Sequence, residues 1–128
     1  MSKPLRTPLK TALGLGSARH GVHHFLVQRV TAVALLFLSL WFVWTVLAVL
    51  RSDYAGAHAL IAQPCNAVLM IAFVVAIFWH TQLGLQVVVE DYVHTRWLEW
   101  TLQIAIKFVC FLGAAASVLA VIRIALGR

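Results

Sequence analysis

The stretch HTQLGLQVVVEDY, residues 80–92, carries polar side chains through an otherwise apolar segment. A helix rises about 1.5 Å per residue, so His80 would lie roughly 15 Å below Glu90, near the middle of a bilayer core about 30 Å thick. Positions 80, 84, 87 and 91 share one helical face, which reads His, Gly, Val, Asp. We therefore interpret this stretch as a helix that holds a cofactor within the membrane and meets a polar reactant at its end.

The composition is that of a membrane protein. Of 128 residues, 62% are hydrophobic and 11% are charged, and the mean hydropathy is +0.93, whereas soluble domains carry about 25% charged residues. The net charge is +6, but the basic residues collect before the first apolar run and form no stripe with interleaved aromatics, which argues against nucleic-acid binding. The two cysteines are too few for an iron–sulfur cluster held by this chain alone, since a cluster needs about four thiolates.

Three apolar segments are long enough to cross a bilayer, and we expect helices at about 26–50, 67–89 and 100–122. The uncharged run Val30–Leu50 exceeds the apolar core of a cleaved secretory signal, which spans about 7–15 residues. The sequence thus predicts an all-α membrane protein, with an N-terminal arm over residues 1–24 and a three-helix transmembrane anchor over residues 25–128. We expect a loop before Asn66, and close helix contact at the small residues Gly113–Ser117.

Charge sets the expected orientation. Five basic residues precede the uncharged run Val30–Leu50, and only Arg51 lies in the first loop. The positive-inside rule then predicts a cytoplasmic N-terminus, a cytoplasmic turn at 90–99 and a periplasmic C-terminus, although Arg123 and Arg128 run against this bias. We expect a multi-pass protein of the bacterial inner membrane; the alternative is a mitochondrial inner-membrane protein whose basic arm is a transit peptide.

His80 is the first candidate site residue. A neutral imidazole is a good ligand for haem iron, and polar groups at membrane depth are costly and usually functional. The alternative is a hydrogen bond to a neighbouring helix. Gly84, one turn away, would leave room for a flat group against the backbone. Zinc binding and a proton relay are disfavoured, because the spans hold no second ligand and no carboxylate.

Two further groups of residues lie near the expected cytoplasmic boundary. Arg29 and the cluster His20, His23 and His24 could neutralise haem propionates by charge-assisted hydrogen bonds. Alternatively, Arg29 binds lipid phosphate, and His20 and His24 are solvated. The Tyr92 hydroxyl could donate to a quinone carbonyl while Asp91 orients it or relays a proton. The alternative for this pair is an interfacial tyrosine beside a solvated aspartate. For Lys107 we expect a stem along its helix and an ammonium group that reaches the interface.

Three motifs in order resemble one family: GVHHFLVQRVTA (21–32), His80-x-x-x-Gly84, and Glu90-Asp91-Tyr92-Val93-His94. They are similar to the smaller hydrophobic membrane anchor of succinate dehydrogenase, the D-type anchor of respiratory complex II, from about Gly14 to the end of the chain. Leu26 and Val27 depart from the pattern, in which a tryptophan often follows the His-Phe pair.

The resemblance implies a role for each candidate. His80 would be one axial ligand of a single haem b, the second coming from the other anchor subunit. His23 and Arg29 would lie near the propionates, and Gly84 would pack against the haem. Tyr92 with Asp91 would hydrogen-bond ubiquinone at its reduction site.

The implied partners are a larger cytochrome b-type anchor that completes a helix bundle, an iron–sulfur subunit and a flavoprotein, so FAD and iron–sulfur clusters belong to partner subunits. The chain would anchor a succinate:ubiquinone oxidoreductase and perform no succinate chemistry itself. One alternative is the anchor of a quinol:fumarate reductase. Others are a small transporter or channel subunit, which should show mid-membrane carboxylates or broken helices, and a free-standing cytochrome b, which needs two buried histidines or a homodimer.

Overall fold

The computed structural model describes residues 19–127 and, before them, Thr7, Leu9 and Ala12. Most of the N-terminal arm predicted over residues 1–24 therefore lies outside the described residues, as do its basic residues Lys3, Arg6 and Lys10.

Residues 19–127 contain four helices: α2 (Arg19–Leu50), α3 (Tyr54–Ala62), α4 (Pro64–Tyr92) and α5 (Arg96–Ala125). The three long helices are apolar enough to cross a membrane, and this part of the chain contains no β-strand. The prediction of an all-α membrane protein with three transmembrane helices is thus confirmed.

Local sequence explains where the helices begin and end. The polar residues after Leu50 end α2, and the Asp53 carboxylate caps α3 by accepting a hydrogen bond from the Gly56 backbone N–H at 2.8 Å, which satisfies one free donor of a helix start. Pro64 occupies the first turn of α4, where its missing N–H costs nothing. The connection from α4 to α5 is only three residues, 93–95.

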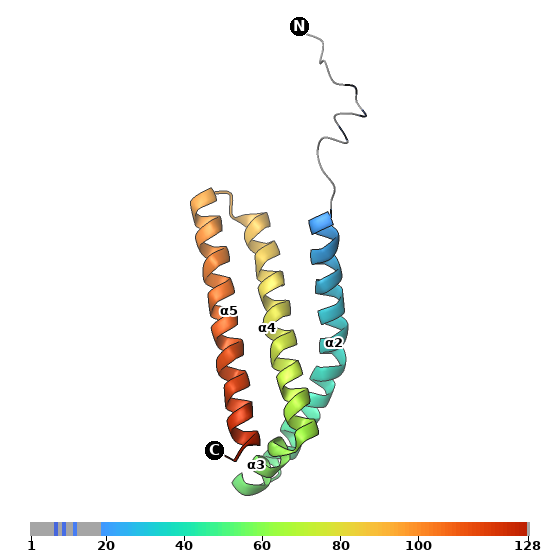
Figure 1. Ribbon diagram of the computed structural model, residues 1–128, viewed down its shortest axis with the longest axis vertical. Coiled ribbons are helices and arrows are strands. Elements are labelled where there is room, and N and C mark those ends of the chain that lie inside the picture. Colours follow the sequence, from blue (N-terminus) through green and yellow to red (C-terminus); the bar gives the residue numbers. More distant parts are fainter. Residues whose placement is uncertain (1–6, 8, 10–11, 13–18, 128) are drawn as a thin grey trace.

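Helix α3 was not predicted, because the segment between the first two spans was expected as a loop. It lies at the end of the molecule where α2 finishes and α4 starts (Figure 1), and it contacts all three long helices. The Asn66 amide donates to the carbonyl oxygen of Leu60 at 2.8 Å, which ties α3 to the first turn of α4. Helix α3 therefore packs across this end of the molecule.

Helix α4 occupies the middle of the three long helices (Figure 1). It contacts both α2 and α5, whereas α2 and α5 do not contact each other within the described residues. The start of α2, the end of α4 and the start of α5 lie at the same end of the molecule, which we call the Tyr92 end. The three long helices therefore form a single row, and both broad faces of this row are open to lipid or to other subunits.

Few side chains are buried by this arrangement. Within the described residues the buried set is small: Thr45, Ala67, Phe73, Leu83, Val89, Cys110 and Val121. Large apolar side chains such as Phe37 and Phe108 are about two-thirds exposed, a pattern that a bilayer tolerates and water does not. Contacts between helices, such as the stacked rings of Phe42 and Phe73 with centroids 4.5 Å apart, therefore hold the row together.

The close approach of α4 and α5 depends on Gly113. A Cβ atom at this position would lie 2.7 Å and 2.8 Å from the ring atoms Cε1 and Cζ of Phe78. The close contact expected for the small-residue patch is thus found at its first residue.

We expect Gly113→Ala to lower the stability of the α4–α5 pair by about 1–3 kcal/mol, the usual cost of overpacking. Thermal unfolding of the detergent-solubilised protein measures this loss. In a Phe78→Leu background the same substitution should cost much less, because the ring that the methyl group strikes is gone. An equal loss in both backgrounds would show that the Phe78 contact is not the cause.

Candidate functional site at the α2–α4 seam

His80 points toward α2. Its Nδ1 atom lies 3.0 Å from the Thr31 hydroxyl, a hydrogen bond that joins residues 49 positions apart. The side chain is half-buried, and among the described residues Thr31 is its only hydrogen-bond partner. The ring is therefore held through Nδ1, while Nε2 has no hydrogen-bond partner among the described residues.

The same seam continues one turn toward the Tyr92 end. A Cβ atom added to Gly84 would meet only the Gln28 amide nitrogen, at 3.8 Å, which is ordinary contact. The other end of that amide, Gln28 Oε1, is buried without a hydrogen-bond partner. Packing among the described residues therefore does not require glycine at position 84, and the space beside it is available to another group.

His23 and His24 line a hollow of about 300 Å³ between α2 and α4, together with Val27, Trp79, Gln82 and Leu83. His24 Nε2 is buried and has no hydrogen-bond partner. An unpaired buried polar atom costs about 1–3 kcal/mol. Two such atoms in one seam, on His24 and Gln28, indicate that a polar group outside the described residues completes it.

Arg29 is not brought beside His80. It precedes Thr31 by two positions, so it projects from α2 about 160° away from the side that meets His80. Its side chain is exposed, and its guanidinium lies over the Phe25 ring at 5.1 Å from the centroid. Any contact between Arg29 and a group held by His80 depends on what packs against α2 from outside, so its assignment to propionates stays a prediction.

Tyr92 and Asp91 end α4 and are both exposed; the Tyr92 side chain is 78% exposed. Asp91 lies on the helical face of His80, three turns or about 16 Å farther along the axis. Tyr92 projects about 100° away from Asp91. The structure thus puts both groups at the Tyr92 end, where neither side chain forms a hydrogen bond or ion pair with another described residue.

A polar cluster beside Tyr92 was not predicted. Gln86 donates to the Glu90 carboxylate at 2.8 Å, and Gln103 of α5 lies 3.5 Å from both Glu90 and Glu99. The i, i+4 spacing of Gln86 and Glu90 is the only sequence signal for it. The cluster joins α4 to α5 near their connection.

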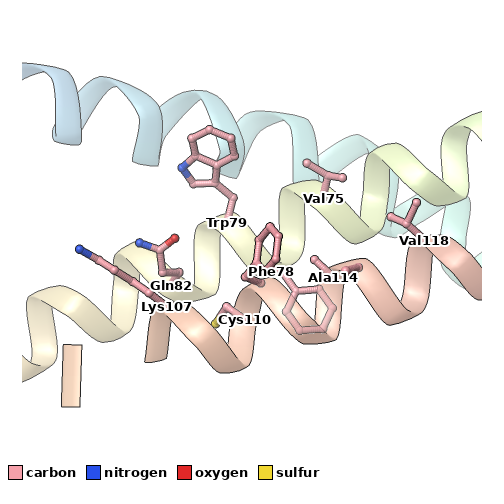
Figure 2. A pocket seen from close by; sticks show the side chains of 10 residues that line it. Val75, Phe78, Trp79, Gln82, Lys107, Cys110, Ala114 and Val118 are labelled. Atoms are coloured by element: carbon pink, nitrogen blue, oxygen red, sulfur yellow. The ribbon is translucent and has the colours of Figure 1, made fainter. Parts of the chain in front are cut away.

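A larger hollow of about 450 Å³ lies between α4 and α5 (Figure 2), opened by the small side chains of Ala114 and Ala115. Its lining is apolar except near Gln82 and Lys107. Figure 2 shows the Lys107 side chain extended along α5 toward the helix start, as expected for a lysine that reaches for the interface. The described residues include no group of three or more His, Cys, Asp or Glu side chains that could hold a metal ion.

Comparison with known proteins defines the class to which this arrangement belongs. Residues 3–114 match the family model described as succinate dehydrogenase/fumarate reductase transmembrane subunit. The chain belongs to this family, as a membrane anchor subunit of the succinate dehydrogenase type, so the resemblance noted from the sequence motifs is confirmed.

Three relatives show the extent of the likeness, and each is described as a succinate dehydrogenase hydrophobic membrane anchor subunit. The protein of Rickettsia bellii is 36% identical over 121 residues, covering 94% of this chain and 97% of the relative. That of Rickettsia typhi is 33% identical over 105 residues, or 82% and 84% of the two chains. That of Paracoccus denitrificans is 32% identical over 124 residues, or 94% and 93%. No solved structure matches the chain significantly.

Proposed function

We propose that this chain anchors a succinate:ubiquinone oxidoreductase in the bacterial inner membrane, shares a b-type haem with a second anchor subunit and contributes to the site of ubiquinone reduction. Family membership supports the anchor role and a part in electron transfer. Flavin and iron–sulfur clusters would belong to the soluble partner subunits, which perform the succinate chemistry. The Tyr92 end would face the cytoplasm, where those subunits dock, and the C-terminus would face the periplasm.

The hydrogen bonding of the His80 ring is the observation that supports the haem part of this proposal. Its imidazole is fixed through Nδ1 by Thr31, and its Nε2 atom has no partner among the described residues. The space beside Gly84 on the same helix is open. Two buried polar atoms of the seam, His24 Nε2 and Gln28 Oε1, have no hydrogen-bond partner among the described residues. These features fit a haem held by His80 Nε2, with His23 and Arg29 as the basic residues available to its propionates. When bound, the haem supplies reversible one-electron chemistry.

At the end of α4, the chain's own residues would bind the quinone. The Tyr92 hydroxyl would donate a hydrogen bond to a quinone carbonyl oxygen, and the Asp91 carboxylate would accept and pass on protons as the oxygen gains them. Both side chains are exposed and form no hydrogen bond or ion pair with another described residue, as required of groups that meet a diffusing reactant. The Glu90–Gln103 contact between α4 and α5 would keep this helix end in place.

The rival class of small transporter or channel subunit receives no support from the three spans. Their described residues show unbroken helices and hold no carboxylate between Pro64 and Val89 or between Leu102 and Ala125. The fumarate-reducing direction shares the family model, but all three relatives described above carry the succinate dehydrogenase description, which favours succinate oxidation.

Purification of the tagged chain from its own membranes in mild detergent tests the proposal. We expect a flavoprotein, an iron–sulfur protein and a second hydrophobic subunit to copurify, with one b-type haem per flavin in the optical spectrum. A chain that purifies as a homodimer with haem and without flavin would instead be a free-standing cytochrome b. A chain without any redox partner would contradict the proposal.

A further inference from the structure

We infer that Thr31 is a positioning residue for the haem ligand: its hydroxyl accepts a hydrogen bond from His80 Nδ1–H and thereby leaves the Nε2 lone pair free to bind iron. This inference rests on the proposed haem ligation by His80. It adds a residue of α2 to the proposed haem-binding site and assigns the tautomer of the His80 ring.

The Thr31 hydroxyl group has a single proton to donate. Thr31 Oγ1 lies 2.8 Å from the Val27 carbonyl oxygen, 3.1 Å from the Gln28 carbonyl oxygen and 3.0 Å from His80 Nδ1. Carbonyl oxygens only accept, whereas an imidazole nitrogen can donate or accept according to its tautomer. If the hydroxyl proton goes to a carbonyl, as is usual for threonine within a helix, His80 Nδ1 must carry the proton in its bond to Thr31.

The tautomer has a direct consequence for metal binding. A neutral imidazole protonated on Nδ1 has its lone pair on Nε2, and for His80 this is the ring nitrogen without a hydrogen-bond partner among the described residues. Histidine ligands commonly donate their second ring N–H to an oxygen acceptor, which fixes the ring and raises the basicity of the ligating nitrogen. Thr31 supplies this acceptor from α2, so one hydrogen bond both joins the two helices and prepares the ligand.

Matched threonine substitutions in α2 provide the test. Thr31→Val keeps the shape of the side chain and removes the hydroxyl, and Thr31→Ala removes it without placing a second methyl group against His80. Thr31→Ser retains the acceptor. Thr45→Val is the control, since the Thr45 hydroxyl makes the same kind of bond to the Trp41 carbonyl oxygen at 2.9 Å but no hydrogen bond to an imidazole of the described residues.

In the purified complex, we expect Thr31→Val and Thr31→Ala to weaken haem binding about 10–100-fold, the usual effect of losing such a partner. Haem per flavin after prolonged detergent washing measures this loss. The midpoint potential of the remaining haem should rise, because a less basic ligand stabilises the oxidised iron less. Thr31→Ser and Thr45→Val should leave both quantities near the wild-type values.

The outcomes separate this inference from the proposed function. Haem content and potential in Thr31→Val and Thr31→Ala equal to those of Thr45→Val, together with haem loss in His80→Ala, would overturn the role of Thr31 and leave His80 as the ligand. A midpoint potential that falls on loss of the hydroxyl would also contradict it, because that would mean that Thr31 donates to Nδ1. Retention of the haem in His80→Ala would overturn the proposed function itself.

Discussion

His80→Ala is expected to abolish the b-type haem spectrum of the complex while leaving the soluble subunits able to oxidise succinate. Loss of a partner that only orients a ligand costs about 10–100-fold in metal affinity, so loss of the ligand itself should cost about 100-fold or more. The reduced-minus-oxidised optical spectrum, scaled to flavin content, measures the change.

Two controls make the His80→Ala result specific. His58→Ala removes a histidine of α3, where His58 packs near the Tyr54 ring at the end of the molecule opposite Tyr92, and should leave the spectrum unchanged. Imidazole added to His80→Ala membranes should restore part of the haem signal, because the substitution leaves a space of the size of the missing ring. A normal spectrum in His80→Ala without imidazole would defeat the assignment.

Tyr92→Phe is expected to lower quinone reduction about 100-fold, the low end of the contribution of a positioned proton donor, while electron transfer from succinate to an artificial dye persists. The substitution removes one hydroxyl from an exposed ring and leaves its apolar part in place. Parallel assays of succinate:quinone and succinate:dye turnover, on the same preparation, measure the difference.

The chain offers a matched control for this substitution. It contains two tyrosines, Tyr54 and Tyr92, and both are exposed, with 86% and 78% of their surface accessible. They lie at opposite ends of the molecule, so Tyr54→Phe should leave both turnovers unchanged. Equal quinone turnover in Tyr92→Phe and Tyr54→Phe would remove Tyr92 from the quinone site.

The sequence predicted the long helices because membrane crossing imposes a length and a composition that are readable without any contact information. It missed α3 because that helix is only nine residues long, lies between polar residues and gains its stability from contacts with the ends of the other helices. A short segment held by tertiary contact carries no periodic signal of its own.

The candidate site could be predicted only in part. His80 could be singled out as a candidate because a titratable side chain in an apolar run is rare. Its contact with Thr31 depends on the register between α2 and α4, which the sequence of either helix does not contain. The same register determines which way the Arg29 side chain projects relative to the seam. Its position near the boundary was readable, whereas its projection away from the seam followed only when Thr31 was seen to contact His80.

The most direct test of His80 as the haem ligand is a cryo-electron microscopy map of the purified complex at a resolution that separates side chains from porphyrin. The proposal predicts iron bonded to His80 Nε2, about 2 Å away as in other metal–imidazole bonds, with Thr31 Oγ1 on the opposite nitrogen. A map in which residue 80 contacts acyl chains or protein alone, with no porphyrin beside it, would contradict the proposal.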